Sequence, residues 1–235
     1  MSAARTDVTA ARKARIARLA RLAGLYAVTP DIADTALLAR NVEAAIAGGA
    51  AAIQYRNKRA DSALRHEQAH AIARLPARTR TLLIVNDDAA LAAAVNADGV
   101  HVGEDDGAIA TARALVGNDR LVGASCYGDI ERAYAAVDAG VDYVAFGSFF
   151  DSATKPAARR ASIDVLRRAA LLAVPVVAIG GITSSNASSL IDAGATAVAV
   201  ITDVFASGDP ASITRAAAAI VRACTTERRP ASTPR

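Results

Sequence analysis

The chain has 235 residues, 53% of them hydrophobic and only 4% aromatic, which suits one large domain or two small ones with a mostly aliphatic core. Its two cysteines, Cys126 and Cys224, lie far apart and form no metal-ligand motif, so a reduced, cytoplasmic protein is expected. The net charge of +4 comes from the chain ends, since residues 1–22 carry +5 and residues 225–235 carry +2; the remaining −3 of residues 23–224 argues against a nucleic-acid-binding protein.

The first predicted element is a basic amphipathic helix over residues 8–22. Its apolar residues, expected to face the rest of the protein, are Val8, Ile16, Leu19 and Leu22. A transit peptide, which is also rich in Arg and Ala, is the alternative interpretation. There is no signal-peptide core and no apolar run long enough to span a membrane. We therefore expect three parts: an N-terminal helix (1–23), a body (24–224) and a disordered tail (225–235).

Short apolar runs alternate with helix-like segments throughout the body. The runs are typical of fully buried parallel strands and cover residues 24–28, 51–56, 82–86, 99–102, 121–125, 143–147, 176–180 and 197–201. Helices are expected near residues 34–48, 62–75, 87–96, 107–116, 129–139, 159–173, 184–193 and 211–223. The expected N-caps are Asp34, Ser62 and Ser184. The expected C′ glycines are in Gly48-Gly49 and at Gly140 and Gly194.

Eight strand–helix units in about 200 residues predict an α/β fold, a compact (β/α)8 TIM barrel, because an open doubly wound sheet usually has fewer strands. In such a barrel the chemistry lies in the loops that follow the strands. The polar residues at the predicted strand ends are therefore the candidates for a functional site.

Cations gather after the second predicted strand. If that strand continues, Gln54, Arg56 and Lys58 lie on one side of it, because side chains alternate with a period of two. A forked guanidinium beside an ammonium suits a phosphate or pyrophosphate. An ordinary solvated strand end is the alternative.

Acids follow the next two strands, as Asn86-Asp87-Asp88 and Glu104-Asp105-Asp106. Either cluster alone would serve the following helix, with Asn86 as an N-cap and the carboxylates complementing the helix dipole. Because neighbouring strands of a barrel end side by side, both clusters are also expected to lie near the cations of the second loop. Two carboxylates there would let Mg²⁺ bridge the protein and a polyanion, whereas without metal they would repel it.

The remaining strand ends carry fewer charges. Ser125 follows the fifth strand, but no histidine is expected at a triad-like position, so we discount it as a nucleophile. The loop after the sixth strand, residues 148–156, has hydroxyls and a lysine that suit a ligand. Gly180-Gly181 and Ile201-Thr202 follow the last two strands, where barrels commonly bind phosphate on backbone amides; a plain turn is the alternative. Two anion sites would suit an enzyme that joins two phosphorylated molecules.

A competing motif, His66-Glu67-Gln68-Ala69-His70, matches the H-E-x-x-H signature of zinc proteases. The motif lies on a predicted outer helix, away from the strand ends. The remaining histidine, His101, lies inside the fourth predicted strand. We therefore interpret the motif as a chance match.

Six segments in order along the chain carry a family resemblance: Gln54 to Lys58, IVNDD, ADGVHVGEDD, GASCY, YVAFGSFFDSATKP and PVVAIGGIT. They closely resemble the thiamine-phosphate synthase family, over residues 24–205. The resemblance implies a (β/α)8 barrel and a Mg²⁺-dependent transferase of thiamine biosynthesis. Its small-molecule substrates would be hydroxymethylpyrimidine pyrophosphate and hydroxyethylthiazole phosphate, and its products thiamine monophosphate and pyrophosphate.

The resemblance also assigns roles to residues. The pyrimidine pyrophosphate would be held by Gln54, Tyr55, Arg56, Asn57, Lys58, Asn86, Ser125 and Lys155. The thiazole phosphate would be held by Ser152, Ala153, Thr154, Gly181, Ile201 and Thr202. The metal would be bound by Asp87 and Asp106. The catalytic set would be Arg56, Lys58, Ser125 and Lys155, whose cations neutralise the departing pyrophosphate while the thiazole nitrogen captures the pyrimidine methylene cation.

The sequence departs from the family pattern at four positions: Asn57, Asp88, Glu104 and Ser152. The first replaces a common acid, the second a common basic residue, the third a frequent Gln and the last a frequent Thr. The added acids leave open whether Asp88, Glu104 or Asp105 also coordinates the metal.

Three other barrels compete with this interpretation. A thiazole tautomerase, and a non-catalytic barrel that binds thiamine precursors, would not need Asp87, Asp106, Arg56 and Lys155 together. An isomerase or aldolase would need a general base or a lysine inside the barrel, and no predicted strand contains a lysine. The sequence is compatible with a homo-oligomer, and it predicts neither a membrane nor a nucleic-acid partner.

Overall fold

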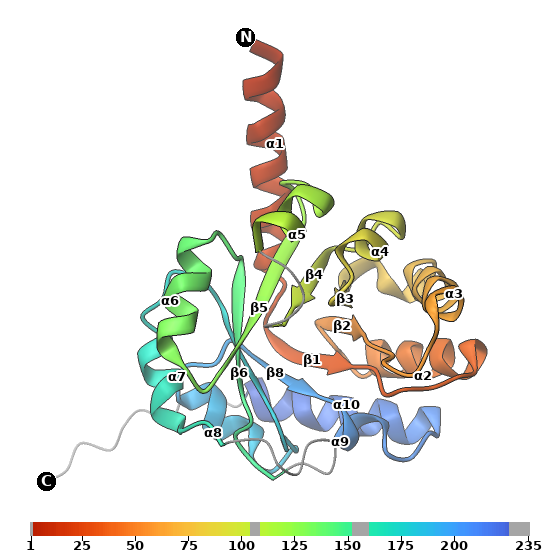
Figure 1. Ribbon diagram of the computed structural model, residues 1–235. Helices are drawn as coiled ribbons and strands as arrows, with labels where there is room; N and C mark the ends of the chain where they lie inside the picture. Colours follow the sequence, from red (N-terminus) through yellow and green to blue (C-terminus); the bar gives the residue numbers. More distant parts are fainter. Residues whose placement is uncertain (1, 104–108, 152–159, 226–235) are drawn as a thin grey trace, which may run out of the picture.

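The computed structural model of the protein describes residues 2–103, 109–151 and 160–225. Within them, eight parallel strands close into a barrel in sequence order, and helices surround the barrel (Figure 1). The strands are β1 (Gly24–Val28), β2 (Ala52–Tyr55), β3 (Leu82–Asn86), β4 (Gly99–Val102), β5 (Leu121–Tyr127), β6 (Tyr143–Gly147), β7 (Val176–Ile179) and β8 (Ala197–Val200). The predicted (β/α)8 barrel is therefore confirmed.

Helices precede the barrel and alternate with its strands. They are α1 (Ser2–Leu19), α2 (Thr35–Ala47), α3 (Ser62–Ala73), α4 (Ala89–Ala94), α5 (Ile109–Val116), α6 (Ile130–Asp138), α7 (Ile163–Ala169), α8 (Ala187–Asp192), α9 (Thr202–Phe205) and α10 (Pro210–Thr225), with a 3₁₀ turn, η1 (Pro76–Arg80), before β3. The short helix α9, directly after β8, was not predicted from the sequence. Of the predicted tail, Thr225 ends α10, and residues 226–235 fall outside the described part of the chain.

The helix ends follow the sequence signals only in part. Asp34 caps α2 as predicted, its side chain accepting the backbone N–H three residues ahead at 2.9 Å. Asp61 rather than Ser62 caps α3, because its carboxylate makes the same kind of bond at 2.8 Å. Ser184 caps no helix, since α8 begins only at Ala187. Glycines with positive φ follow three helices as predicted: Gly49, Gly140 and Gly194.

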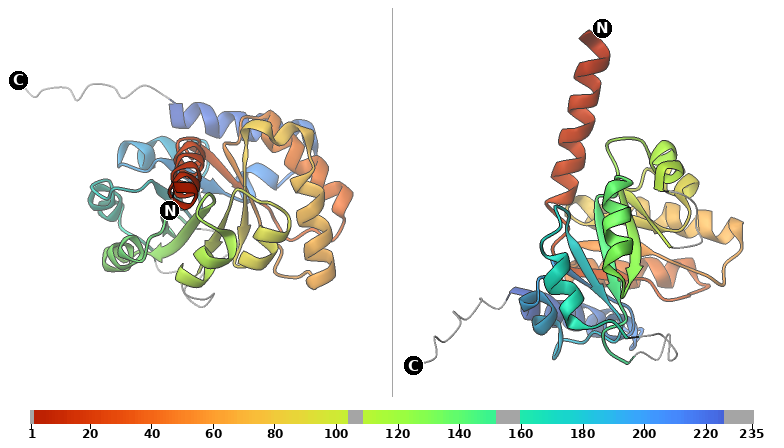
Figure 2. Two further views of the ribbon diagram at one scale, coloured as in Figure 1. Left: turned by 90° about the horizontal axis from the view of Figure 1, so that it is seen from above. Right: turned by 60° about the vertical axis from the view of Figure 1, so that its left-hand side comes forward.

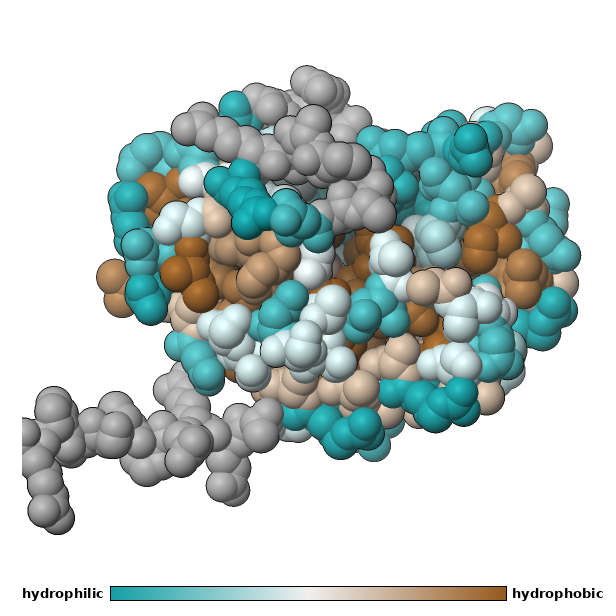
Figure 3. Space-filling model, turned by 90° about the horizontal axis from the view of Figure 1, so that it is seen from below, coloured by the Kyte–Doolittle hydropathy of each residue, from teal (hydrophilic) through white to brown (hydrophobic). Residues whose placement is uncertain are grey.

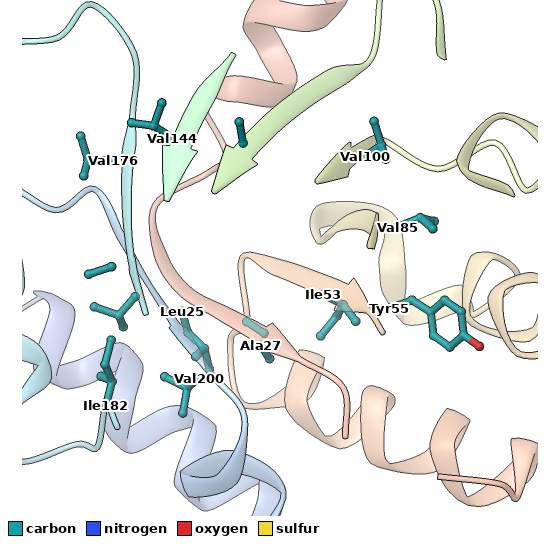
Figure 4. Close-up of a cluster of buried hydrophobic side chains, with 14 of the residues drawn as sticks. Leu25, Ala27, Ile53, Tyr55, Val85, Val100, Val144, Val176, Ile182 and Val200 are labelled. Atoms are coloured by element: carbon teal, nitrogen blue, oxygen red, sulfur yellow. The ribbon is translucent and has the colours of Figure 1, made fainter. Parts of the chain in front are cut away.

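Alternating strand residues divide the apolar side chains into two cores. Outward-facing residues such as Leu25, Ile53 and Val200 pack under the helices, where Figure 4 shows them. Inward-facing residues fill the barrel itself, and the Tyr143 ring fits there only because Gly123 lacks a Cβ, which would lie 2.0 Å from that ring. The interior is therefore a packed core, and ligand binding is left to the strand ends.

The last turn of α1 lies against the barrel, and the rest of the helix projects away from the barrel (Figures 1 and 2). Leu22, just after the helix, is 1% exposed and packs with the inward-facing cluster, against which Leu19 also packs. Ile16 is 54% exposed, so the prediction that it faces the body is wrong. The side chain of Val8 lies outside the described part of the chain.

Two aspartates at the amino-terminal ends of strands attach α1 to the barrel. The sequence predicted that an apolar stripe would do so. Asp98, before β4, lies 3.1 Å from Arg18 Nε, and Asp142, before β6, lies 3.3 Å from Arg15 Nε. Each carboxylate also accepts a backbone N–H of the preceding strand, at 2.9 Å and 2.8 Å respectively. The same acids therefore connect strands of the barrel to each other and to α1.

Figure 3 shows the face opposite the projecting part of α1, to which the carboxyl ends of the strands point. Hydrophobic residues are visible there between hydrophilic ones. Among the helices of the described ranges, none is both long and apolar enough to cross a membrane.

Candidate active site

The loops after β1 and β2 present a guanidinium and an ammonium at the mouth of the barrel. Asp31, after β1, lies 3.3 Å from Arg56 Nη1 and accepts the Lys58 backbone N–H at 2.9 Å. Thr29 Oγ1 donates to the Arg56 carbonyl and accepts the Arg56 backbone N–H, both at 2.9 Å. These bonds hold Arg56 in place before any ligand binds.

Two of the three residues between Gln54 and Lys58, namely Tyr55 and Asn57, turn their side chains away from the mouth. Tyr55 is buried and donates to Gln68 Oε1 at 2.9 Å, and Asn57 Nδ2 donates to the same oxygen at 3.0 Å. Gln68 belongs to α3, so both side chains lie in the outer layer, whereas Gln54 points into the barrel. Strand alternation explains the opposite directions of Gln54 and Tyr55, the last two residues of β2. We infer that Tyr55 and Asn57 shape the loop and that their side chains do not contact substrate.

Asp87 and Asp88 follow β3, and their carboxylates do different things. Asp88 caps α4 by accepting the Leu91 N–H at 2.8 Å, so the predicted capping by Asn86 is wrong. Asp87 has a φ of +67°, which is uncommon outside glycine. Its Oδ2 lies 3.8 Å from Lys58 Nζ. The backbone therefore turns the Asp87 carboxylate toward the cations of the second loop and away from helix capping.

The ends of β3 and β4 lie side by side, since Asn86 pairs in register with His101 and the Asp87 N–H donates to the His101 carbonyl at 2.8 Å. The chain beyond β4 is described as far as Gly103. The predicted metal ligand Asp106 falls outside the described residues. So do Glu104, Asp105, Ser152, Ala153, Thr154 and Lys155.

Ser125 has a histidine beside it, contrary to the sequence-based expectation. His101 Nε2 lies 3.0 Å from Ser125 Oγ, because β4 and β5 are adjacent and both side chains face inward. The other ring nitrogen lies 3.1 Å from the Tyr143 hydroxyl, where a hydrolytic triad has a carboxylate. Burial raises the pKa of the neighbouring Cys126 thiol to about 12, so it is no thiolate nucleophile at neutral pH. We interpret Ser125 as a hydrogen-bonding group.

A cavity of about 210 Å³ opens beside Arg56. Its walls come from the loops after β1, β2 and β8, which meet because β1 lies between β8 and β2. The lining residues are Pro30, Asp31, Arg56, Ile201, Thr202, Phe205 and Ala206. Arg56 thus lies with Ile201 and Thr202 in one cavity, whereas two separate anion sites were predicted for them.

Gly180 and Gly181 form a tight turn after β7, with φ values of +108° and +63°. A Cβ on Gly180 would lie 2.1 Å from Ser148 Oγ, and one on Gly181 would lie 2.2 Å from the Asp151 carbonyl oxygen. The glycines therefore let the loops after β6 and β7 pack closely. Because this packing alone accounts for both glycines, phosphate binding by Gly181 stays a prediction.

The H-E-x-x-H motif lies on α3, outside the barrel (Figure 1). His66 Nδ1 lies 2.8 Å from the Ser62 carbonyl oxygen, one turn earlier. Glu67 accepts a hydrogen bond from Thr35 Oγ1 at 2.6 Å. Across residues 2–103, 109–151 and 160–225, no group of three His, Cys, Asp or Glu side chains is placed to hold a metal ion. These contacts give the motif residues structural partners on the barrel surface.

Two kinds of residue at the site were not predicted from the sequence. Asp31 orients Arg56 and lines the cavity, and its position just after the first strand is the signal that could have identified it. Tyr26 and Tyr143 face the barrel interior, and a strand pattern does not distinguish a phenol that joins a polar network from one that only fills a core.

Comparisons with known proteins show the family to which the chain belongs and support the barrel fold. The family model of thiamine monophosphate synthase matches residues 25–204. The thiamine-phosphate synthase of Thiobacillus denitrificans is 53% identical over 200 residues, which cover 85% of this chain and 93% of that protein. That of Azoarcus sp. is 54% identical over 188 residues, covering 80% and 91%. The solved thiamine phosphate pyrophosphorylase from Pyrococcus furiosus matches with a TM-score of 0.75 at 32% identity, covering 88% of this chain and 97% of that one. The chain therefore belongs to the thiamine monophosphate synthase family.

Proposed function

We propose that the protein is a Mg²⁺-dependent thiamine-phosphate synthase. It condenses hydroxymethylpyrimidine pyrophosphate with hydroxyethylthiazole phosphate and releases thiamine monophosphate and pyrophosphate. The observation that carries the proposal is the cluster of Arg56, Lys58 and Asp87 at the barrel mouth, beside the cavity that Arg56 shares with Thr202. We place the reaction in the cytoplasm, which the free thiols of Cys126 and Cys224 support.

Arg56 and Lys58 bind the pyrophosphate in this proposal. A guanidinium that Asp31 already orients loses little freedom when it pairs with phosphate oxygens. Each cation also lies beside a carboxylate, Arg56 at 3.3 Å from Asp31 and Lys58 at 3.8 Å from Asp87. The four charges nearly cancel, so binding a pyrophosphate with its several negative charges requires further cations.

Asp87 suits a hard divalent cation because its carboxylate is partly exposed and, unlike that of Asp88, takes no part in capping α4. Asp87 and Asp106 would hold the Mg²⁺, and Lys155 would add a further positive charge. When bound, Mg²⁺ would neutralise charge on the pyrophosphate as it leaves.

The remaining residues position the two reactants. The bond between the pyrimidine methylene and pyrophosphate breaks, the electron-rich aminopyrimidine stabilises the methylene cation, and the thiazole nitrogen forms the new bond to it. Gln54 and Ser125 orient the pyrimidine. The thiazole phosphate is held by Ser152, Ala153, Thr154, Gly181, Ile201 and Thr202. Holding both reactants in line replaces a collision in solution, and no protein nucleophile is needed.

The proposal is tested by incubating the purified protein with both precursors and Mg²⁺ and measuring thiamine monophosphate and pyrophosphate by chromatography. We expect equal amounts of the two products, and none when one precursor or Mg²⁺ is omitted. Isomerisation of the thiazole phosphate without condensation would indicate a tautomerase. Binding of the precursors without turnover would indicate a non-catalytic barrel. Either result would overturn the proposal.

A further inference from the structure

Polar side chains form a continuous hydrogen-bonded chain across the interior of the barrel. Gln54 Nε2 donates to the Tyr26 hydroxyl at 3.0 Å, and the Tyr26 and Tyr143 hydroxyls are 3.0 Å apart. The Tyr143 hydroxyl lies 3.1 Å from His101 Nδ1, and His101 Nε2 lies 3.0 Å from Ser125 Oγ. These hydrogen bonds therefore connect Gln54 and Ser125, the two residues that orient the pyrimidine in the proposed function. The three residues between them have no role assigned so far.

The three connecting side chains are built into the core. Tyr26, Tyr143 and His101 are all buried, and the His101 and Tyr143 rings stack with centroids 5.5 Å apart. Burial raises the pKa of both phenols, so each keeps its O–H at neutral pH. Phenylalanine would fill the same space without a buried polar group that needs a partner. The hydroxyls therefore serve the chain of bonds and not packing alone.

One arrangement of protons gives every phenol O–H of these bonds an acceptor. A protonated phenol has one O–H to donate. In this arrangement the Tyr26 oxygen accepts from Gln54, and the Tyr26 proton goes to Tyr143. The Tyr143 proton goes in turn to His101 Nδ1, and the His101 tautomer that accepts at Nδ1 donates from Nε2 to Ser125. Ser125 is left to donate its own O–H elsewhere, and Gln54 is left with its carbonyl oxygen as an acceptor.

We propose that Tyr26, Tyr143 and His101 are positioning residues that set the hydrogen-bonding polarity of the pyrimidine site and thereby select a 4-aminopyrimidine over its 4-oxo analogue. The inference rests on the proposed function, since the ligand is the aminopyrimidine ring of the proposed substrate. A 4-aminopyrimidine has N–H groups for Gln54 and ring-nitrogen lone pairs for Ser125. The 4-oxo ring offers a carbonyl and a ring N–H, the reverse pattern, and the chain can match it only if all of its members reverse together.

The test measures binding and not turnover, because a 4-oxo substrate would also react more slowly for chemical reasons. Dissociation constants for thiamine monophosphate and its 4-oxo analogue are measured by isothermal titration calorimetry on the 235-residue protein with Mg²⁺. We expect the wild type to bind the amino form at least about 30-fold more tightly. Tyr143→Phe breaks the chain at its centre and is expected to lower that ratio to about threefold. Tyr26→Phe isolates Gln54 and is expected to do the same, which keeps the test available if Tyr143→Phe does not fold.

Tyr55→Phe is the matched control, because it also removes a buried phenol hydroxyl with a glutamine partner, but on the outer side of β2. Its binding ratio should stay within about twofold of the wild type. A wild-type ratio near one, or a ratio unchanged in both Tyr143→Phe and Tyr26→Phe, overturns the inference. If the protein still forms thiamine monophosphate in that case, the proposed function stands alone. If it neither binds nor forms thiamine monophosphate, the proposed function fails and the inference with it.

Discussion

Two adjacent aspartates show how a single backbone angle separates two roles. Asp88 has extended backbone, and its carboxylate caps the first turn of α4. Asp87 has a φ of +67°, and its carboxylate turns toward Lys58. Sequence alone gives both residues the same explanation, since either acid suits a helix start. The distinction depends on backbone conformation, which a string of acids after a strand does not reveal.

Asp87→Gly and Asp88→Ala should separate activity from stability. Asp87→Gly removes the proposed metal ligand at a backbone angle that glycine adopts easily. We expect turnover to fall at least about 100-fold, while the free energy of unfolding stays within about 1 kcal/mol. Asp88→Ala removes a cap and should lower that free energy by about 1 kcal/mol with turnover retained. Urea denaturation and pyrophosphate release measure the two effects, and the reversed pattern would show that the roles are misassigned.

Gln68→Ala tests the reassignment of Tyr55 and Asn57 to the outer layer. The change leaves both buried side chains without their shared acceptor, so the free energy of unfolding should fall by about 2–3 kcal/mol. The KM for the pyrimidine pyrophosphate should not change. His66→Ala, on the same helix but exposed, is the control and should alter stability by less than about 0.5 kcal/mol. A raised KM in Gln68→Ala with stability intact would place these residues back in the site.

At the scale of whole elements, the strands were predicted well because their signal is local. An apolar run of four to seven residues between helical stretches is enough, and every observed strand lies within about two residues of its predicted range. Helix starts were less predictable, since Asp61 and Ser62 are both good caps and the sequence does not say which makes the bond. The ion pairs that attach α1 to Asp98 and Asp142 were not predicted, because such pairs produce no apolar periodicity in the sequence.

Two truncations test how α1 is attached. Deleting residues 1–12 removes only the projecting part, so the melting temperature should stay within about 2 °C of the full chain. Deleting residues 1–22 also removes Arg15, Arg18 and the buried Leu22, and the loss of Leu22 alone should lower the free energy of unfolding by about 2–5 kcal/mol. Thermal unfolding followed by circular dichroism measures both. Equal destabilisation by the two deletions would contradict this attachment.

At the scale of the whole molecule, the two cores place several ionisable groups where their charged forms are unfavourable. Burial raises the pKa of Cys126 to about 12 and that of Cys224 to about 11, and it raises the pKa values of Tyr26, Tyr55 and Tyr143 as well. The folded protein therefore holds these protons more tightly than the unfolded chain, whose thiols ionise near pH 9 and phenols near pH 10.

Stability should consequently decline in alkali. Because these folded-state pKa values are raised, their contribution is fully present below about pH 9 and is lost as the pH rises toward 12. Urea denaturation at a series of pH values should show a constant free energy of unfolding between about pH 7 and 8 and a fall above about pH 9. Cys126→Ala should make that fall less steep. Stability that rises between pH 9 and 11 would contradict the burial of these groups.

The arrangement of the site is also a property of the whole barrel. The sequence identified Arg56, Asp87 and Thr202 as candidates because each follows a strand. It did not predict that Arg56 and Thr202 would line one cavity, since that depends on β8 pairing with β1 to close the barrel. It likewise separated His101 from Ser125, which only the packing of β4 against β5 brings to 3.0 Å.

In the proposed function Asp87 holds a divalent cation that assists the departure of pyrophosphate. The most direct test is the rate of pyrophosphate release as a function of Mg²⁺ concentration, with both precursors saturating, in the wild type and in Asp87→Asn, which keeps the side-chain shape and tolerates the positive φ. We predict that Asp87→Asn needs at least about tenfold more Mg²⁺ for its half-maximal rate and reaches a much lower maximum. A Mg²⁺ dependence and a maximal rate that match the wild type would contradict the assignment of Asp87 as a metal ligand.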